Sequence, residues 1–327
     1  CYSPGTELTI FRTSWSHDAI FVNFLGSGRS HTALTHAHQD SGHFSLFAHG
    51  DYLAIDTGRY NGGADQHSVM LVDGEEDSSV IRTGWGTDFK AGRIADFQRH
   101  AMLDYARADS AAQRQCIWAD RHLLFVRLGG DDGYVVTIDN VNKDNSKHRF
   151  VWQMHAHPEC KIQLAGERSA SVHGPHARLD ITFAIPAPGH FANETHTLEL
   201  RTDEKWWSWP YGRNQDTSHL EKNIRSTSVH RPRLSGILTG LNGLMACVMS
   251  PRRNGQDALT VRTGGGNGVI RIDVQAGQIS DTILVAMDHG YINIPGYRGL
   301  TELALIRRAN DGVITCWTSN GAPVTFS

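Results

Sequence analysis

Residues 36–74, HAHQDSGHFSLFAHGDYLAIDTGRYNGGADQHSVMLVDG, decide how this chain folds. Within this stretch, two apolar runs at 43–48 and 52–55 lie on either side of the tripeptide His49-Gly50-Asp51. A turn-forming tripeptide between two such runs predicts a hairpin with a three-residue loop. Residues 68–72 predict a further strand. The stretch therefore predicts consecutive strands joined by short turns.

The same kind of pattern extends to both sides of this stretch. Residues 7–15 and 19–25 precede it with strand-like patterns. Further strand candidates follow at roughly the 8–12-residue spacing of antiparallel sheets, namely residues 121–128, 134–141, 148–155, 179–185, 236–241, 244–249, 258–262, 268–274, 281–287, 300–307 and 313–318. Helical periodicity is scarce. The sequence therefore predicts an all-β fold of stacked antiparallel sheets.

A change in composition near residues 202–233 indicates a domain boundary. This segment holds three tryptophans and many polar residues, but few strand signals. The strands after it are short and separated by glycine turns. We therefore expect a β-sandwich domain over residues 1–235 and a smaller C-terminal β-sheet over residues 236–327.

Composition excludes several classes of protein. The 327 residues are 39% hydrophobic and 20% charged, a balance that buries a core and excludes a disordered chain. No apolar run approaches the ~18–20 residues of a membrane helix, so a membrane partner is not expected. The net charge of −3 argues against a nucleic-acid partner bound through a basic surface. Five widely spaced cysteines without a CxxC motif exclude a cysteine zinc ribbon.

Nineteen histidines invite a search for a metal site, because imidazole is the commonest metal ligand in proteins. In an extended chain His36 and His38 point to the same side. The predicted hairpin can bring His38, Asp56 and His67 together. Two imidazoles, one carboxylate and an open position suit tetrahedral Zn²⁺. The alternative is that these histidines are ordinary solvated loop residues.

The HxHxD motif at residues 36–40 also occurs in metallo-β-lactamase-like hydrolases, as HxHxDH. Here Ser41 replaces the last histidine. The segment that follows predicts strand, turn and strand rather than a helix. Both departures count against a hydrolase.

The motifs HAHQDSGHFSL, YLAIDTGRY and QHSVMLVDG, together with TIFRTSW at residues 9–15, resemble the C-terminal β region of heparinase II/III-like polysaccharide lyases. That family includes oligoalginate lyase-type enzymes. The resemblance is specific over about the first 75 residues and looser over residues 121–159.

The resemblance implies one metal ion per chain, normally zinc, with manganese or calcium as alternatives. By their positions in the motifs, His38, Asp56 and His67 match its ligands. His36 matches a catalytic residue of the cleft, and Tyr60 lies where a second one is expected.

Substrate binding is expected to involve guanidinium groups, which suit bidentate recognition of carboxylate or sulfate. The candidates are Arg59 in the YLAIDTGRY motif and the pair Arg231 and Arg233 in a basic stretch. The alternative for the pair is a solvated loop.

The chemistry that the resemblance implies is β-elimination on uronate-containing acidic polysaccharides or oligosaccharides. A base removes the C5 proton, the developing charge is neutralised, and an acid protonates O4. A uronyl C5-epimerase of the same architecture and a non-catalytic carbohydrate-binding β module are the alternatives.

Lyases of this family carry an α/α-toroid domain before the β region, whereas this chain starts directly in the β region. We therefore expect a toroid as a partner, on the same chain or on a separate one. The substrate class implies a periplasmic or secreted protein.

Overall fold

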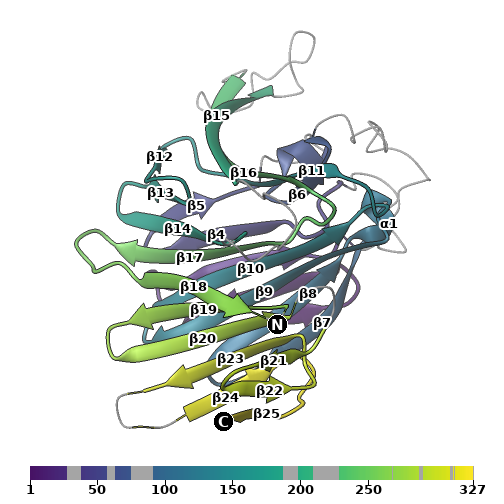
Figure 1. Ribbon diagram of the computed structural model, residues 1–327. Helices are drawn as coiled ribbons and strands as arrows, with labels where there is room; N and C mark the ends of the chain where they lie inside the picture. Colours follow the sequence, from purple (N-terminus) through teal and green to yellow (C-terminus); the bar gives the residue numbers. More distant parts are fainter. Residues whose placement is uncertain are drawn as a thin grey trace.

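The computed structural model describes residues 1–27, 38–56, 63–74, 91–186, 198–208, 228–266, 268–286, 290–309, 312 and 314–326. At residues 204–208, 228–230 and 326 it describes the backbone alone. Almost all of the regular structure in these ranges is antiparallel β-sheet (Figure 1). The exceptions are the helix α1 (Ala111–Arg114) and the 3-10 helix η1 (Ala64–Gln66). The all-β prediction is confirmed.

Three sheets are built mainly from the first 253 residues. A five-stranded sheet follows chain order, with β1 (Tyr2–Ser3), β2 (Leu8–Arg12), β3 (Phe21–Leu25), β4 (Phe44–Ala48) and β5 (Asp51–Ala54). An eight-stranded sheet has the order β12 (Lys161–Leu164), β13 (Ser169–His173), β14 (Ala177–Ile185), β17 (Met245–Arg253), β10 (Asp132–Asn142), β9 (Trp118–Gly129), β8 (Leu103–Asp109) and β7 (Arg93–Arg99). A four-stranded sheet has the order β15 (Glu199–Ser208), β16 (Ser228–Gly240), β11 (His148–His155) and β6 (Met70–Val72).

Two further sheets come from the C-terminal part. One has the order β18 (Thr260–Gly266), β19 (Val269–Ala276), β20 (Ile279–Ala286), β23 (Leu303–Arg308) and β24 (Ile314–Thr318). The other comprises β21 (Ile292–Ile294), β22 (Tyr297–Gly299) and β25 (Val324–Phe326). The expected division at residues 235 and 236 runs through β16, and the chain leaves the larger sheets only after β17. The domain division itself stays a prediction.

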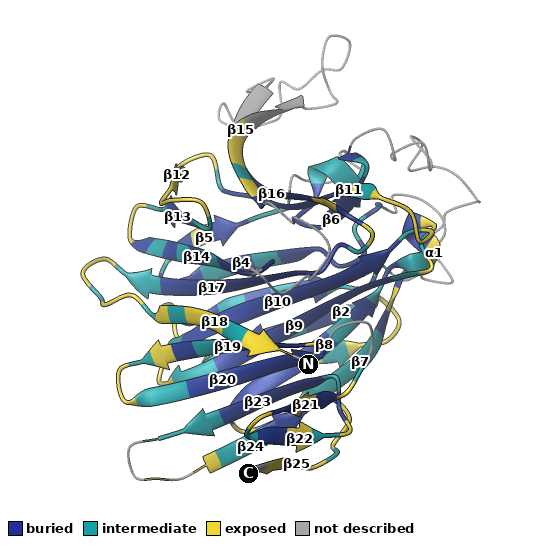
Figure 2. Ribbon diagram, viewed as in Figure 1, coloured by how far each residue is buried: buried dark blue, intermediate teal, exposed yellow. Residues whose placement is uncertain are grey.

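The eight-stranded sheet is the middle layer of the protein, since both of its faces are buried. On β10, Val135 packs in the core shared with the five-stranded sheet. The next residue, Val136, packs in a second core shared with the sheet of β18–β20, β23 and β24. Successive side chains of a strand point to opposite faces, so a sheet between two layers needs apolar residues at consecutive positions. Figure 2 shows the resulting run of buried residues along β9 and β10.

The hairpin between β4 and β5 differs from the prediction in its loop. Asp51 already pairs with Ala48, so the loop has two residues, His49 and Gly50, rather than three. Both have positive φ, 51° and 92°, as the favoured two-residue hairpin turns require. Asp51 belongs to the strand because its carboxylate accepts hydrogen bonds from two backbone N–H groups near the start of β14, at 2.7 Å each.

None of the helices among the described residues is long and apolar enough to cross a membrane.

Candidate functional site

The β4–β5 hairpin and the segment that follows it gather a cluster of histidines and aspartates. His43 directly precedes β4 and Asp56 follows β5, so the antiparallel pairing places both at the same end of the hairpin. His67 comes directly after η1 and shortly before β6. The chain thereby returns to the hairpin end that carries His43 and Asp56.

His67 and Asp56 are in direct contact, as the sequence predicts. His67 Nδ1 lies 3.1 Å from Asp56 Oδ2, and His43 Nε2 lies 3.6 Å from the same oxygen. Both imidazoles are buried, whereas the Asp56 side chain is 38% exposed. The ligand atoms of these three residues all lie within 4.8 Å of one another.

A second group of three shares His67. The ligand atoms of His38, Asp40 and His67 also lie within 4.8 Å of one another. The rings of His38 and His67 have centroids 5.1 Å apart. His67 therefore lies beside both of the other predicted ligands, His38 in one group and Asp56 in the other.

His43 and Asp40 are not among the site residues predicted from the sequence. Asp40 carried a usable signal, because it lies two residues after His38 in the HxHxD motif and extended chains repeat with period 2. His43 resembles the first residue of an ordinary strand. Only the hairpin pairing shows that this end of β4 faces Asp56.

Burial sets the electrostatics of the cluster. It lowers the pKa of His43 to about 3, so this imidazole is neutral at physiological pH. Burial also lowers the pKa of His67, but the hydrogen bond to Asp56 and the charges of Asp40, Asp56 and Asp65 outweigh it. The pKa of His67 is therefore raised. His67 therefore binds a proton at a higher pH than His43 does.

Two buried ring nitrogens of the cluster have no hydrogen-bond partner among the described residues, namely His43 Nε2 and His67 Nε2. A buried polar atom without a partner costs roughly 1–3 kcal/mol, so such atoms indicate a role beyond packing. By contrast, His43 Nδ1 accepts a hydrogen bond from the Ser68 N–H at 3.0 Å. That bond places the proton of neutral His43 on Nε2, toward Asp56.

One buried arginine holds the two loops of the cluster in place. Arg121 on β9 forms a bidentate ion pair with Asp139 on β10, with N–O distances of 2.7 and 3.0 Å. Its Nη1 donates to the carbonyls of Gly42 and Ser68, at 2.9 and 2.8 Å. These carbonyls adjoin His43 and His67. The middle sheet therefore fixes the positions of both histidines.

The family model described as heparinase II/III-like, C-terminal, matches residues 15–236. The chain belongs to the heparinase II/III-like C-terminal family. This match contains the whole histidine–aspartate cluster.

The heparinase II/III-like fold is shared with a solved structure described as "Heparinase III-BT4657 gene product, Methylated Lysines". The two agree with a TM-score of 0.61 at 13% sequence identity. The match covers 97% of this chain and 41% of the other, so this chain spans about two fifths of that structure's length. No curated protein matches the sequence.

The predicted substrate-binding arginines have different surroundings in this heparinase II/III-like chain. Arg231 Nη1 donates to the carbonyl oxygen of Asp56 at 2.7 Å, so Arg231 adjoins the cluster. Arg233 lies two residues further along β16 and forms a bidentate ion pair with Asp203. It lines a hollow of about 190 Å³ together with Arg149 and Arg201.

Three of the predicted site residues, His36, Arg59 and Tyr60, lie outside the described residues. Their roles stay predictions.

His155 is a further buried histidine near the cluster. It is fully buried, and its Nε2 lies 3.2 Å from the carbonyl oxygen of Asp65 in η1. Burial, with a contribution from the charge of Arg233, lowers its pKa to about 3. The sequence predicts His155 as the end of a strand, and it is the last residue of β11.

Proposed function

We propose that this chain is the β portion of a polysaccharide lyase that cleaves uronate-containing acidic polysaccharides or oligosaccharides by β-elimination. Its family supports the lyase class. We place the site at the buried cluster around His67. Substrates of this kind lie outside the cytoplasm, so the proposal includes a periplasmic or secreted protein.

The proposal includes one divalent ion at the cluster, normally zinc, with manganese or calcium as alternatives. Imidazole nitrogens and carboxylate oxygens are typical zinc ligands. The two groups of three that share His67 support an ion here, since the ligand atoms within each group all lie within 4.8 Å of one another. We propose His38, Asp56 and His67 as ligands, with Asp40 within reach as a further carboxylate.

His43 has a different role in this proposal. A ring nitrogen that carries a proton cannot bind a metal, and the hydrogen bond from Ser68 places the His43 proton on Nε2. His43 therefore orients the Asp56 carboxylate, in the way that groups behind a metal ligand commonly do. Arg231 holds the backbone of Asp56 from the other side.

The elimination itself breaks the C5–H bond and the C4–O4 bond of the uronate and forms a C4–C5 double bond. The base takes the C5 proton, and an acid returns a proton to the departing O4. In the proposal His36 neutralises the substrate carboxylate or moves a proton, and Tyr60 lies in the same cleft. Arg59, Arg231 and Arg233 are proposed to bind substrate anions, and a bound ion supplies positive charge beside the cleft. A toroid domain, on the same or a separate chain, supplies the principal base.

Products distinguish this proposal from its alternatives. The full protein, with its toroid, is incubated with oligoalginate, oligoglucuronate and heparin-derived tetrasaccharides, and products are analysed by ultraviolet absorbance and mass spectrometry. A lyase yields an unsaturated uronate without added water. An epimerase yields a product of unchanged mass with inverted C5, and a hydrolase yields products that have gained one water. Binding without any product, with the toroid present, would contradict the lyase proposal and favour a binding module.

A single variant tests the role of His36 in the same assay. His36→Ala is expected to abolish turnover while the metal content stays at the wild-type level. Loss of the metal together with turnover would instead make His36 a ligand.

A further inference from the structure

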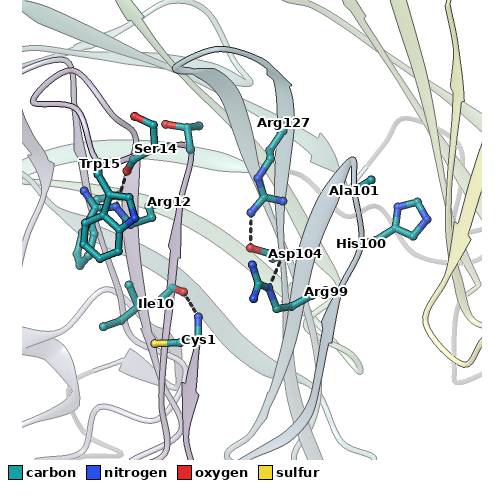
Figure 3. A pocket seen from close by; sticks show the side chains of 12 residues that line it. Cys1, Ile10, Arg12, Ser14, Trp15, Arg99, His100, Ala101, Asp104 and Arg127 are labelled. Carbon is teal, nitrogen blue, oxygen red and sulfur yellow. Dashed lines mark hydrogen bonds and ion pairs between the residues drawn. The ribbon is translucent and has the colours of Figure 1, made fainter.

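A broad groove lies beside Arg127 on strand β9, whereas the histidine cluster lies beside Arg121 on the same strand. It has a volume of about 910 Å³, within the ~300–1,000 Å³ range of ligand sites. Figure 3 shows Arg12 and Trp15 on one side of it and Arg99, Asp104 and Arg127 on the other. None of the cluster residues lines it.

The distance between groove and cluster follows from strand β9. Arg121, which holds the cluster loops, and Arg127, which lines the groove, are six residues apart on this strand. At ~3.3 Å per residue they are separated by roughly 20 Å. A saccharide bound in the groove would therefore occupy a site separate from the proposed lyase site.

One wall of the groove presents the exposed ring of Trp15, and neighbouring residues hold this ring in place. Trp15 is 88% exposed, and the guanidinium of Arg12 stacks on its ring at 3.9 Å from the centroid. Because the ring is so exposed, its other face is open to solvent. The hydroxyls of Ser14 and Ser16, on either side of Trp15, donate to the Asp131 carboxylate at 2.5 and 2.6 Å. A platform that is already ordered loses little conformational entropy when a ligand binds.

Positive charge dominates the lining of the groove. Three guanidinium groups, those of Arg12, Arg99 and Arg127, are balanced by one carboxylate, that of Asp104. Arg127 pairs with Asp104 at 2.5 Å, whereas Arg99 lies 3.8 Å from it and is 71% exposed. Among the described residues, no carboxylate lies within ion-pair distance of Arg12. The groove thus carries cationic groups that its own carboxylate does not neutralise.

We propose that this groove is a second binding site, for an acidic oligosaccharide. Trp15 stacks on the apolar face of a sugar ring, and Arg12, Arg99 and Arg127 bind its carboxylate or sulfate groups. The combination favours a saccharide over an acidic peptide, because a pyranose offers a flat face and an anionic edge to the two kinds of side chain at once. An acidic peptide would use the arginines but leave the exposed indole without a flat partner.

The test follows the indole N–H signals of the protein by NMR, with the Trp15 signal assigned from its absence in Trp15→Phe. The probes are an oligoglucuronate tetrasaccharide and a heparin-derived tetrasaccharide. Cellotetraose is the neutral control, and tetraglutamate controls for charge alone. The Trp15 signal is expected to shift with either acidic tetrasaccharide and to stay unmoved with cellotetraose.

Two arginines on β7 provide a matched pair of variants for the same titration. Arg99→Gln removes a groove charge and is expected to weaken the affinity read from the Trp15 signal by roughly five- to tenfold. Arg93→Gln removes an arginine that is similarly exposed, 68%, but does not line the groove, and is expected to leave the affinity unchanged. Equal effects of the two variants would overturn the assignment.

Two further outcomes also contradict the proposal. A Trp15 signal that neither acidic tetrasaccharide moves would show that the groove does not bind this class of ligand. A signal that tetraglutamate moves at the same concentration as the saccharides would show an anion or peptide site instead. Since the readout is local to Trp15 and requires no turnover, failure here leaves the proposed lyase activity untouched, and the reverse also holds.

Discussion

The two ends of strand β9 have different surroundings, although one row of side chains runs between them. Arg121, Leu123, Phe125 and Arg127 point to the same side of the strand, and the middle two pack in the core against the five-stranded sheet. At one end Arg121 is 3% exposed and hydrogen-bonded to Asp139 and two carbonyls. At the other end Arg127 borders an open groove. We propose a small ion at the closed end and an acidic oligosaccharide at the open end.

Arg121→Met is expected to have the largest effect on the closed end. It leaves the 2%-exposed Asp139 without its bidentate partner and releases the loops of His43 and His67. Removing one member of a buried ion pair costs about 3–5 kcal/mol of unfolding free energy. The measurement is chemical denaturation, with Arg93→Met as control, since that exposed pair should contribute less than about 1 kcal/mol. Equal losses in both variants would refute the structural role of Arg121.

Metal removal is expected to have the next largest effect, again at the closed end. An ion bound only by the folded state stabilises it by about 2.7 kcal/mol when its concentration is a hundredfold above Kd. A chelator should therefore lower the Tm of the wild type, and added zinc should restore it. Asp56→Asn, at a half-exposed position that tolerates the change, should start at the lower Tm and respond little to the chelator. A full chelator response in Asp56→Asn would remove Asp56 from the ligand set.

Acidification should destabilise the protein through its buried neutral histidines. Burial lowers the pKa of His43 and His155 from 6.5 to about 3 in the folded protein. Between these two values the unfolded chain binds protons that the folded chain does not. Stability is therefore full above pH 6.5 and falls by about 1.4 kcal/mol per histidine per pH unit below it.

A variant of His155 isolates its share of this slope. His155→Gln should flatten the dependence of unfolding free energy on pH between 6.5 and 4, whereas His176→Gln, at an exposed position, should leave the slope unchanged. An unchanged slope in His155→Gln would mean that its imidazole titrates normally in the folded protein.

The smallest effect on stability is expected at the open end. Trp15→Ala removes a side chain that is 88% exposed, so the unfolding free energy should change by less than about 0.5 kcal/mol. Phe44→Ala in β4, at a fully buried position, should cost about 3–5 kcal/mol. A large loss in Trp15→Ala would make Trp15 a packing residue rather than a binding surface.

The sequence predicts the local part of the closed end because the β4–β5 hairpin is short in sequence. The contact between Asp56 and His67 follows from that hairpin and an eleven-residue separation. The role of Arg121 could not be predicted in this way, since its partners Gly42 and Ser68 lie 79 and 53 residues away. Such contacts depend on how separate sheets stack, and periodicity within one strand does not encode that arrangement.

The order in which the sheets stack could also not be predicted from the sequence pattern. The residues of β10 predict a strand, and their continuous apolar character is consistent with burial on both faces. The identity of the two covering sheets, one before and one after β10 in the chain, appears only in the structure. The groove could not be predicted for the same reason, because Trp15 lies in the loop between β2 and β3 and Arg99 lies on β7 of another sheet.

We propose that the closed end binds a metal ion through His67 and its neighbours. Elemental mass spectrometry on protein purified without added metal tests it directly, in the wild type, Asp56→Asn, His67→Ala and the exposed control His17→Ala, each checked for folding by circular dichroism. We expect about one zinc per chain in the wild type and in His17→Ala, and little or none in the two cluster variants. A wild type without metal, or cluster variants that retain it in the folded state, would rule out this metal site.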